Sequence, residues 1–98
     1  MIQHTVAFRL KHASGSKEEE DFLDATLELA GIPGVNNFRR FRQVSRKSPF
    51  SFGLSMEFSD HDAFEEYCSH SVHTRFVEDR WIPEVEDFQE TDFEPLGE

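Results

Sequence analysis

The first ten residues alternate between apolar and polar positions. Every second side chain from residue 2 to residue 10 is large and mostly apolar. Because side chains along a strand point to opposite faces with a period of two, this pattern predicts a strand over residues 2–10. The residues on its core-facing side are Ile2, His4, Val6, Phe8 and Leu10. One histidine is therefore expected among apolar neighbours.

A helix is expected to follow, beginning after Ser16. Ser16 and Glu19 have the spacing of a capping box, in which the hydroxyl accepts a bond from a free backbone N–H and the glutamate reaches back. Acidic residues at positions 18–21 suit the positive end of the helix dipole. Gly31 and Pro33 are expected to end the helix. Its apolar side should consist of Phe22, Leu23, Ala25, Leu27, Leu29 and Ala30.

Three further segments are predicted to be strands. Residues 35–44 carry apolar side chains whose spacing departs from two, which indicates a bulge or an irregular edge. Residues 50–58 alternate regularly, and small residues such as Gly53 on the outer side would permit close approach by another sheet. Residues 85–93 carry many acids, which suits an edge strand. The core-facing side of the regular segment is Phe50, Phe52, Leu54, Met56 and Phe58.

Between the last two strands lies a segment with a broken helical pattern. Asp60 is expected to cap one helix, Ser71 to cap a second short one, and Pro83 to close it. The order is strand, helix, strand, strand, broken helix, strand. This order predicts one α+β domain over residues 1–98, a ferredoxin-like βαββαβ fold with helices on one face of an antiparallel four-stranded sheet.

Composition and charge exclude several classes of function. The 98 residues carry a formal charge of −10, which disfavours nucleic acid and anionic membranes as partners. No apolar run approaches the ~20 residues that span a bilayer, and the alternating N-terminus is unlike a signal peptide. The single cysteine excludes an internal disulfide. We therefore expect a cytoplasmic protein.

Basic residues gather in one short segment. Arg39, Arg40 and Arg42, followed by Arg46 and Lys47, make up half of the ten basic residues. An edge or interface strand with ion pairs would explain the cluster, and so would a site for an anionic ligand. The sequence favours the first interpretation and leaves the second open.

The residues best suited to chemistry lie between positions 63 and 81. Tyr67, His70 and His73 follow one another at three-residue steps, which would present a phenol and two imidazoles on one side of a helix. A tyrosine and a histidine can abstract a proton beside a carbonyl group without any cofactor. The same residues could instead form a polar seam of the core.

Metal and thiol chemistry are less well supported. A zinc site from His4, His70 and His73 lacks a cysteine or carboxylate at a spacing that would complete a tetrahedral set, so no metal site is predicted. Cys68 is expected to be an inert core thiol. Asp92, near the end of the last strand, is expected to anchor a loop or a helix terminus.

Several motifs occur in a characteristic order along nearly the whole chain. They are His4-x-Val6-x-Phe8-x-Leu10-Lys11, Ile32-Pro33-Gly34-Val35, the Phe-rich segment 48–58, Tyr67-x-x-His70-x-x-His73-x-x-Phe76-Val77, Trp81-x-Pro83 and Asp92-Phe93. The ordered set resembles the stress-responsive α/β-barrel (Dabb) domain family. This resemblance implies a ferredoxin-like monomer that pairs sheet to sheet with a second copy, forming a dimeric α+β barrel.

The resemblance also implies candidate site residues. One plant branch of the family cyclises linear polyketides with a tyrosine and a histidine, which correspond here to Tyr67 and His73. The surrounding pocket is expected to include His4, Phe22, His70, Phe76 and Trp81. Some relatives hold a divalent ion at the dimer seam through backbone carbonyls, here those of Leu29, Ile32 and Val35, and carbonyl ligands leave no signature in a sequence.

Two classes of function follow from these patterns. The first is a small dimeric cyclase or lyase that acts on a carbonyl compound in an apolar pocket and needs no cofactor. The second is a non-catalytic dimer, either a stress-related scaffold or a binder of small apolar molecules. An apolar pocket with a few polar groups would serve both.

Overall fold

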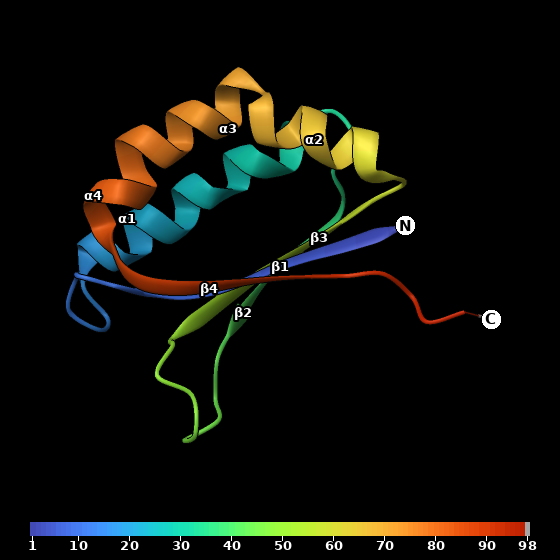
Figure 1. The fold of residues 1–98 in the computed structure, drawn as a ribbon. Coiled ribbons are helices and arrows are strands. Elements are labelled where there is room, and N and C mark those ends of the chain that lie inside the picture. The colour runs from blue at the N-terminus through green and yellow to red at the C-terminus, as the bar shows by residue number, and fades with distance from the viewer. Residues whose placement is uncertain (98) are drawn as a thin grey trace.

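The chain forms an antiparallel four-stranded sheet with strand order β2-β3-β1-β4 and helices on one face (Figure 1). The structure is a computed structural model and describes residues 1–97. The predicted ferredoxin-like βαββαβ arrangement is confirmed. The strands are β1 (Ile2–Leu10), β2 (Asn36–Arg42), β3 (Phe52–Phe58) and β4 (Val85–Phe93).

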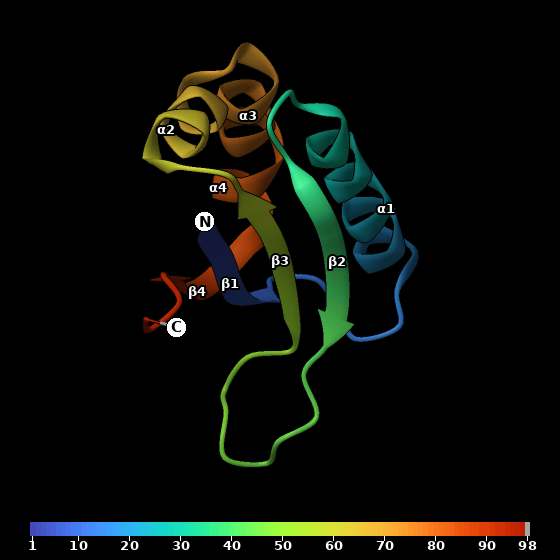
Figure 2. The ribbon, with the colours of Figure 1, turned by 90° about the vertical axis from the view of Figure 1, so that its right-hand side faces the viewer.

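Two helical segments cover the sheet. The first joins β1 to β2 and the second joins β3 to β4, and Figure 2 shows both on the same side, with the loop of residues 43–51 reaching away from them. No helix in the described part of the chain is long and apolar enough to cross a membrane. The helical elements are α1 (Lys17–Ala25), η1 (Thr26–Gly31), α2 (His61–Ser69), α3 (Ser71–Phe76), η2 (Val77–Trp81) and α4 (Ile82–Glu84).

The strands match their predicted patterns closely. β1 and β4 have the predicted bounds, and burial alternates strictly along β1. β2 lies at one edge of the sheet and shifts register between Asn36 and Arg39, where Asn37 adopts a φ of 51°, so the predicted irregularity is confirmed. β3 begins at Phe52, and Phe50 is half-buried in the loop before it, which corrects the prediction for that ring.

The first helix changes its winding midway. Ser16 Oγ accepts the bond from the Glu19 N–H as predicted, but Glu19 Oε1 accepts from the Gly15 N–H, one residue earlier than a capping box requires. From Thr26 the chain winds as a 3-10 helix, in which residues three apart share one side. Leu27 is consequently exposed, contrary to the prediction, and so is Ala30. The residues buried at this spacing are Thr26, Leu29 and Ile32.

The second helical segment breaks earlier than the three-residue spacing suggests. Asp60 caps α2 as predicted, with its Oδ1 2.8 Å from the Ala63 nitrogen. The cap of α3 is His70 rather than Ser71, because the His70 Nδ1 accepts the bond from the Val72 N–H at 3.1 Å. Helical winding then continues past Pro83 to the end of α4, since proline is tolerated in the first turn of a helix.

The core between the two layers is built mainly from aromatic rings. Phe8 of β1, Phe22 of α1 and Phe58 of β3 are fully buried. Phe8 lies 5.1 Å from the Trp81 ring and 5.8 Å from Phe22, and the pairs are tilted, the arrangement that ring quadrupoles favour. Phe58 packs at the opposite end of the β1–β3 pair, 5.2 Å from Phe64 and 5.1 Å from Tyr67, so aromatic rings occupy both ends of the interior.

Candidate functional site

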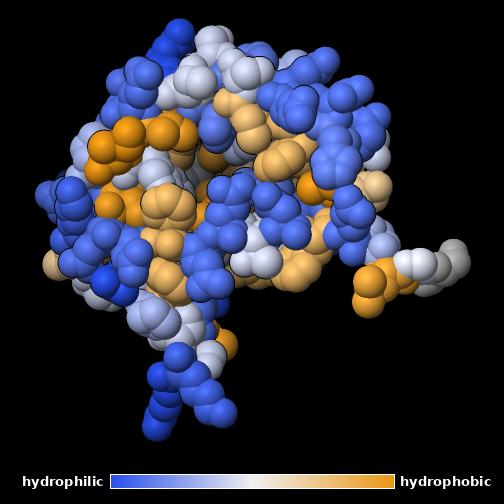
Figure 3. Space-filling view, viewed as in Figure 1, coloured by the Kyte–Doolittle hydropathy of each residue, from blue (hydrophilic) through white to orange (hydrophobic). Residues whose placement is uncertain are grey.

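A cavity of about 220 Å³ lies between the sheet and the second helical segment. Residues of β1, β3 and β4 line it on the sheet side, and residues of η1, α2, α3 and η2 line it on the helical side. In Figure 3 apolar side chains surround a hollow between the helices and β4. Of the predicted site residues, the cavity brings together His4, Tyr67, His73, Phe76 and Trp81.

Tyr67 supplies a protonated phenol to this cavity. It projects from α2 and is 2% exposed. Burial raises the pKa of Tyr67 well above its ordinary value, and Cys68, once ionised at high pH, and Glu90 raise this pKa further. The phenol therefore keeps its proton at neutral pH and is available as a hydrogen-bond donor.

His73 faces Tyr67 from the far side of the helix break. The two ring centroids lie 4.6 Å apart. The His73 Nδ1 lies 2.9 Å from the Cys68 carbonyl oxygen, and because a carbonyl can only accept, Nδ1 must carry a proton in that bond. In the neutral ring the lone pair is then on Nε2. Burial lowers the pKa of His73 more than the Cys68 bond raises it, and the charge of His4 lowers this pKa too. The neutral ring, which has a lone pair free to accept a proton, is therefore favoured.

His4 is held by two carboxylates of β4. It is 8% exposed, and its Nδ1 lies 2.5 Å from Asp92 Oδ1 and 3.5 Å from Glu90 Oε2. The strand register explains this contact, because His4 is directly opposite Asp92 in the β1–β4 pair. The His4 ring also packs 5.0 Å from Phe64 and 6.0 Å from Tyr67, so it lies between the carboxylates of β4 and the aromatic rings of α2.

Glu90 and Asp92 were not predicted to belong to the site. Asp92 was expected to anchor a loop or a helix end and instead pairs with His4, while Glu90 lines the cavity. Burial raises the pKa of Glu90; the charge of His4 lowers this pKa, and Asp92 raises it again. The sequence did carry one usable signal: positions 88, 90 and 92 alternate onto a single face of the last strand.

Two predicted pocket residues lie outside the cavity lining. Phe22 is completely buried and packs 5.7 Å from Phe76 and 6.1 Å from Trp81, so it supports the wall from behind. His70 uses its Nδ1 to cap α3 and is therefore occupied as a structural residue. The helix ends between Tyr67 and His70, so the three-residue periodicity no longer places their side chains together.

Cys68 differs from its prediction in another way. It is exposed rather than buried in the core, and it lines the cavity beside Tyr67. Burial of part of its surface and the charges of Glu90, Asp92 and Glu65 raise the pKa of the thiol. The thiol is thus protonated at neutral pH, which makes it a poor nucleophile.

The structure groups potential metal ligands differently from the sequence analysis. Among residues 1–97, His4, Glu90 and Asp92 place one ligand atom each within 4.8 Å of one another, whereas His70 and His73 belong to no such group. The backbone carbonyls that the family resemblance implies as ion ligands lie at the end of η1 and in the turn that follows it. There the Leu29 and Ile32 carbonyls each accept a backbone N–H at 3.2 Å, and an ion at this turn stays a prediction.

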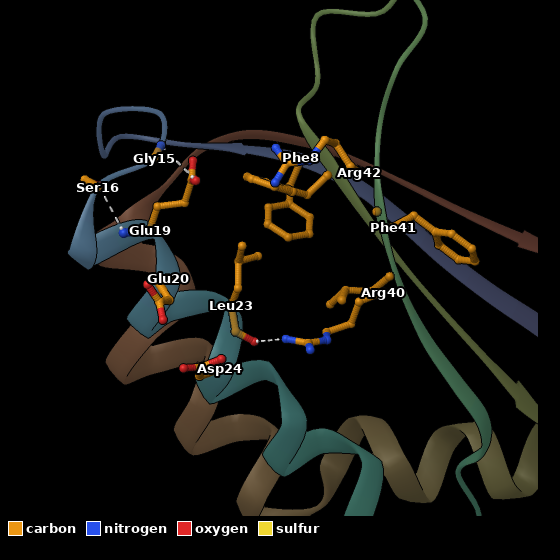
Figure 4. Close-up of a pocket in the computed structure, with 13 residues that line it drawn as sticks. Phe8, Gly15, Ser16, Glu19, Glu20, Leu23, Asp24, Arg40, Phe41 and Arg42 are labelled. Carbon is orange, nitrogen blue, oxygen red and sulfur yellow. Dashed lines mark hydrogen bonds between the residues drawn. The ribbon is translucent and has the colours of Figure 1, made fainter.

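A second hollow, of about 510 Å³, separates α1 from β2 (Figure 4). Arg40 reaches across it to the Leu23 carbonyl at 2.8 Å, and the Arg42 guanidinium lies 5.3 Å from the Phe52 ring. Three acidic residues and two arginines line it, so its charge does not favour an anionic ligand. The arginine segment lies on an edge strand as one interpretation expected, but Arg39 and Arg42 contact aromatic rings and Arg40 a backbone carbonyl, so the expected ion pairs are not what holds these side chains. The acids are Glu19, Glu20 and Asp24.

Comparison with known families agrees with the fold. The family model "Stress responsive A/B Barrel Domain" (Dabb) matches residues 2–95. The chain belongs to the Dabb family. No curated protein sequence matches it.

Solved structures of Dabb-like proteins extend the comparison. A Dabb family protein with a ferredoxin-like fold from Mesorhizobium loti is 54% identical, with a TM-score of 0.96 over 98% of this chain and 97% of that chain. A protein of Thermobifida fusca, described as dimeric, ferredoxin-like and of unknown function, is 21% identical, with a TM-score of 0.77 over 94% of this chain and 88% of that one.

One structural neighbour carries the name of an enzyme. The hydroxynitrile lyase of Passiflora edulis is 15% identical to this chain, with a TM-score of 0.81 over 94% of this chain and 90% of its own. At this level of identity the likeness extends to the fold alone.

Proposed function

We propose that this Dabb protein binds a small carbonyl compound in the cavity and that Tyr67 and His73 perform acid–base chemistry on it. The observation that carries the proposal is the His73 Nδ1–Cys68 bond beside a buried phenol, which leaves an unprotonated Nε2 next to a proton donor in the same cavity. Catalysis of this kind needs one group that accepts a proton and another that stabilises the developing charge.

In the proposed step His73 Nε2 removes a proton from the carbon beside the carbonyl group. The electron pair of the broken C–H bond moves into the carbonyl π system, and the negative charge develops on oxygen. The Tyr67 hydroxyl donates a hydrogen bond to that oxygen. His73 then returns its proton to the substrate or to the leaving group. The step requires no organic cofactor.

The cavity limits the size and polarity of the ligand. About 220 Å³ is smaller than the usual 300–1,000 Å³ of a pocket for a drug-sized molecule. Apolar residues such as Met56, Phe76 and Val77 supply most of the lining. A compact, largely apolar carbonyl compound fits these properties. The lyase neighbour is compatible with this class of reaction by analogy of fold.

Hydrogen–deuterium exchange beside the carbonyl tests the proposal directly. Small aromatic and aliphatic carbonyl compounds are incubated with the protein in D₂O, and exchange is followed by NMR. We expect His73→Ala to lower the rate about 10²–10⁴-fold and Tyr67→Phe to lower it about 10²-fold or more. His61→Ala is the matched control, because His61 is 70% exposed and lies outside the cavity.

The alternative function predicts a different outcome. A non-catalytic binder or scaffold would take up ligands without exchange above the buffer rate, and neither substitution would change the exchange rate. That result would refute the enzyme proposal and leave the binding proposal standing.

We also propose that the protein is a homodimer that pairs through the outer faces of its sheets. The support is the bare outer face, because all helices lie on the other side (Figure 1). Small or uncharged residues such as Ala7, Gly53 and Ser55 line its middle, and Phe41 and Phe93 are about half exposed at its edges. Structural neighbours from three bacteria are described as dimeric.

A further inference from the structure

Three potential metal ligands meet where β4 borders the cavity. The His4 Nδ1 lies 2.5 Å from Asp92 Oδ1 and 3.5 Å from Glu90 Oε2, and all three ligand atoms lie within 4.8 Å of one another. The side chains project from the paired strands β1 and β4, in which His4 is opposite Asp92 and Val6 is opposite Glu90. The register of the β1–β4 pair at this edge of the sheet therefore holds the three groups together.

We propose that His4, Glu90 and Asp92 bind a divalent transition-metal ion, with Zn²⁺ as the ion best suited to the site. An imidazole and two carboxylates are ligands that Zn²⁺ accepts at about 2.0–2.2 Å, and three protein ligands leave one coordination position open. In a tetrahedron of that size the ligand atoms lie about 3.3 Å apart. The His4–Glu90 distance already fits, and Asp92 has to withdraw by less than about 1 Å.

The balance of charge favours a cation at this position. Two carboxylates converge on one imidazole at the edge of an apolar cavity, and a divalent ion bound by all three would offset both carboxylate charges. Within residues 1–97, no other histidine–carboxylate pair belongs to a group of three such ligands. His12 pairs with Glu84, and His61 pairs with Glu94.

The location gives the ion access to a bound ligand. Glu90 and His4 line the same cavity as Tyr67 and His73, and the His4 ring lies 6.0 Å from the Tyr67 ring. The open coordination position would bind an oxygen of the ligand, such as a carbonyl or carboxylate oxygen. Binding of the ion does not depend on the acid–base role of Tyr67 and His73, so either proposal can fail without the other.

Calorimetric titration of the full chain with Zn²⁺ tests the site. We expect one ion per chain in the wild type and at least a tenfold rise in Kd in Glu90→Gln and in Asp92→Asn. Glu86→Gln is the matched control, because it removes the same charge from the same strand at a solvent-exposed ion pair with Arg9. Its Kd should stay within about twofold of the wild-type value, since exposed pairs contribute little. Circular dichroism verifies that each variant is folded.

Paramagnetic Mn²⁺ locates the ion independently of these substitutions. Amide resonances of His4 and of Glu90 to Asp92 should broaden first. If broadening centres on His61 and Glu94, or on His12 and Glu84, the proposed site is wrong. Equal Zn²⁺ affinities of the wild type and Glu90→Gln would overturn it as well.

Discussion

At the scale of single residues, the most informative group is His73. Its ring is half-buried beside Tyr67, and its Nδ1 proton is engaged by the Cys68 carbonyl. Neither the partner nor the burial is evident from the local sequence, because the acceptor is a backbone atom on the preceding helix. His73 was predicted as a site residue and lies in the cavity lining, and the position of its Nδ1 proton follows from the structure.

The lowered pKa of His73 predicts how stability changes with pH. Below the ordinary value of 6.5 the unfolded chain binds a proton at this ring that the folded chain does not bind, so the free energy of unfolding falls as the pH falls through that window. We expect His73→Gln to lose less stability than the wild type between about pH 7.5 and about pH 5. Urea unfolding at several pH values measures the difference.

The same shift predicts the acidic limb of the proposed reaction. Exchange catalysed by His73 should persist below pH 6.5 and decline only as the pH approaches the lowered pKa.

The stability measurement has its own contradicting outcome. If the free energy of unfolding of the wild type and of His73→Gln changes with pH in the same way throughout, the burial of this ring is contradicted. All other histidines are shared by the two proteins and cancel in the comparison.

At the scale of elements, the break between α2 and α3 shapes the site. The chain leaves helical geometry at His70, whose φ and ψ are −64° and 141°, and re-enters it at Ser71. This break lets Tyr67 and His73 meet from two short helices rather than along one. His70 is therefore a positioning residue, and its imidazole substitutes for the hydroxyl or carboxylate of an ordinary N-cap.

Removing this cap should cost stability without removing the cavity. We expect His70→Ala to lower the free energy of unfolding by about 0.5–2 kcal/mol and His70→Asn to retain most of it, since asparagine is a favourable N-cap. Urea unfolding at neutral pH gives these values, and His61→Ala at an exposed site should change stability by less than about 0.5 kcal/mol.

Ligand titration separates the two roles considered for His70. Under conditions where each variant is folded, His70→Ala should bind carbonyl compounds about as tightly as the wild type. A loss of affinity as large as that of Tyr67→Phe would show that His70 contacts the ligand after all.

At the scale of the whole molecule, the uncovered outer face of the sheet is the main feature still to be explained. A Cβ added to Gly53 would lie 3.7 Å from the Val6 carbonyl oxygen and 3.9 Å from the Phe41 Cβ, which are ordinary contacts. The monomer itself therefore does not require glycine there. Close approach of a second sheet would require a small residue at this position.

Substitution of Gly53 therefore tests the dimer. We expect the wild type to sediment at close to twice 11.4 kDa at micromolar concentration and Gly53→Arg to sediment at close to 11.4 kDa. Ser14→Arg places the same side chain on an exposed loop and should remain dimeric. A wild-type monomer, or a Gly53→Arg dimer as tight as the wild type, would rule out pairing through this face.

The sequence by itself determined the elements, their order and the buried faces of the regular strands. Alternation along residues 2–10 and the Asp60 cap are local signals, because they depend on neighbours within one turn or one strand. The ferredoxin-like arrangement followed from their order. The change to 3-10 winding at Thr26 escaped prediction because core packing, rather than local propensity, decides which residues of that segment turn inward.

Only the tertiary structure decided which polar groups share the cavity. Asp92 contacts His4 across 88 positions of sequence, and the pairing register of β1 and β4 alone brings them together. The same holds for the Cys68 carbonyl that orients His73, and for Phe22 and His70, which the fold places outside the lining. Contacts between distant segments leave no periodic pattern in either segment, so their chemistry became evident only when the sheet and helices were assembled.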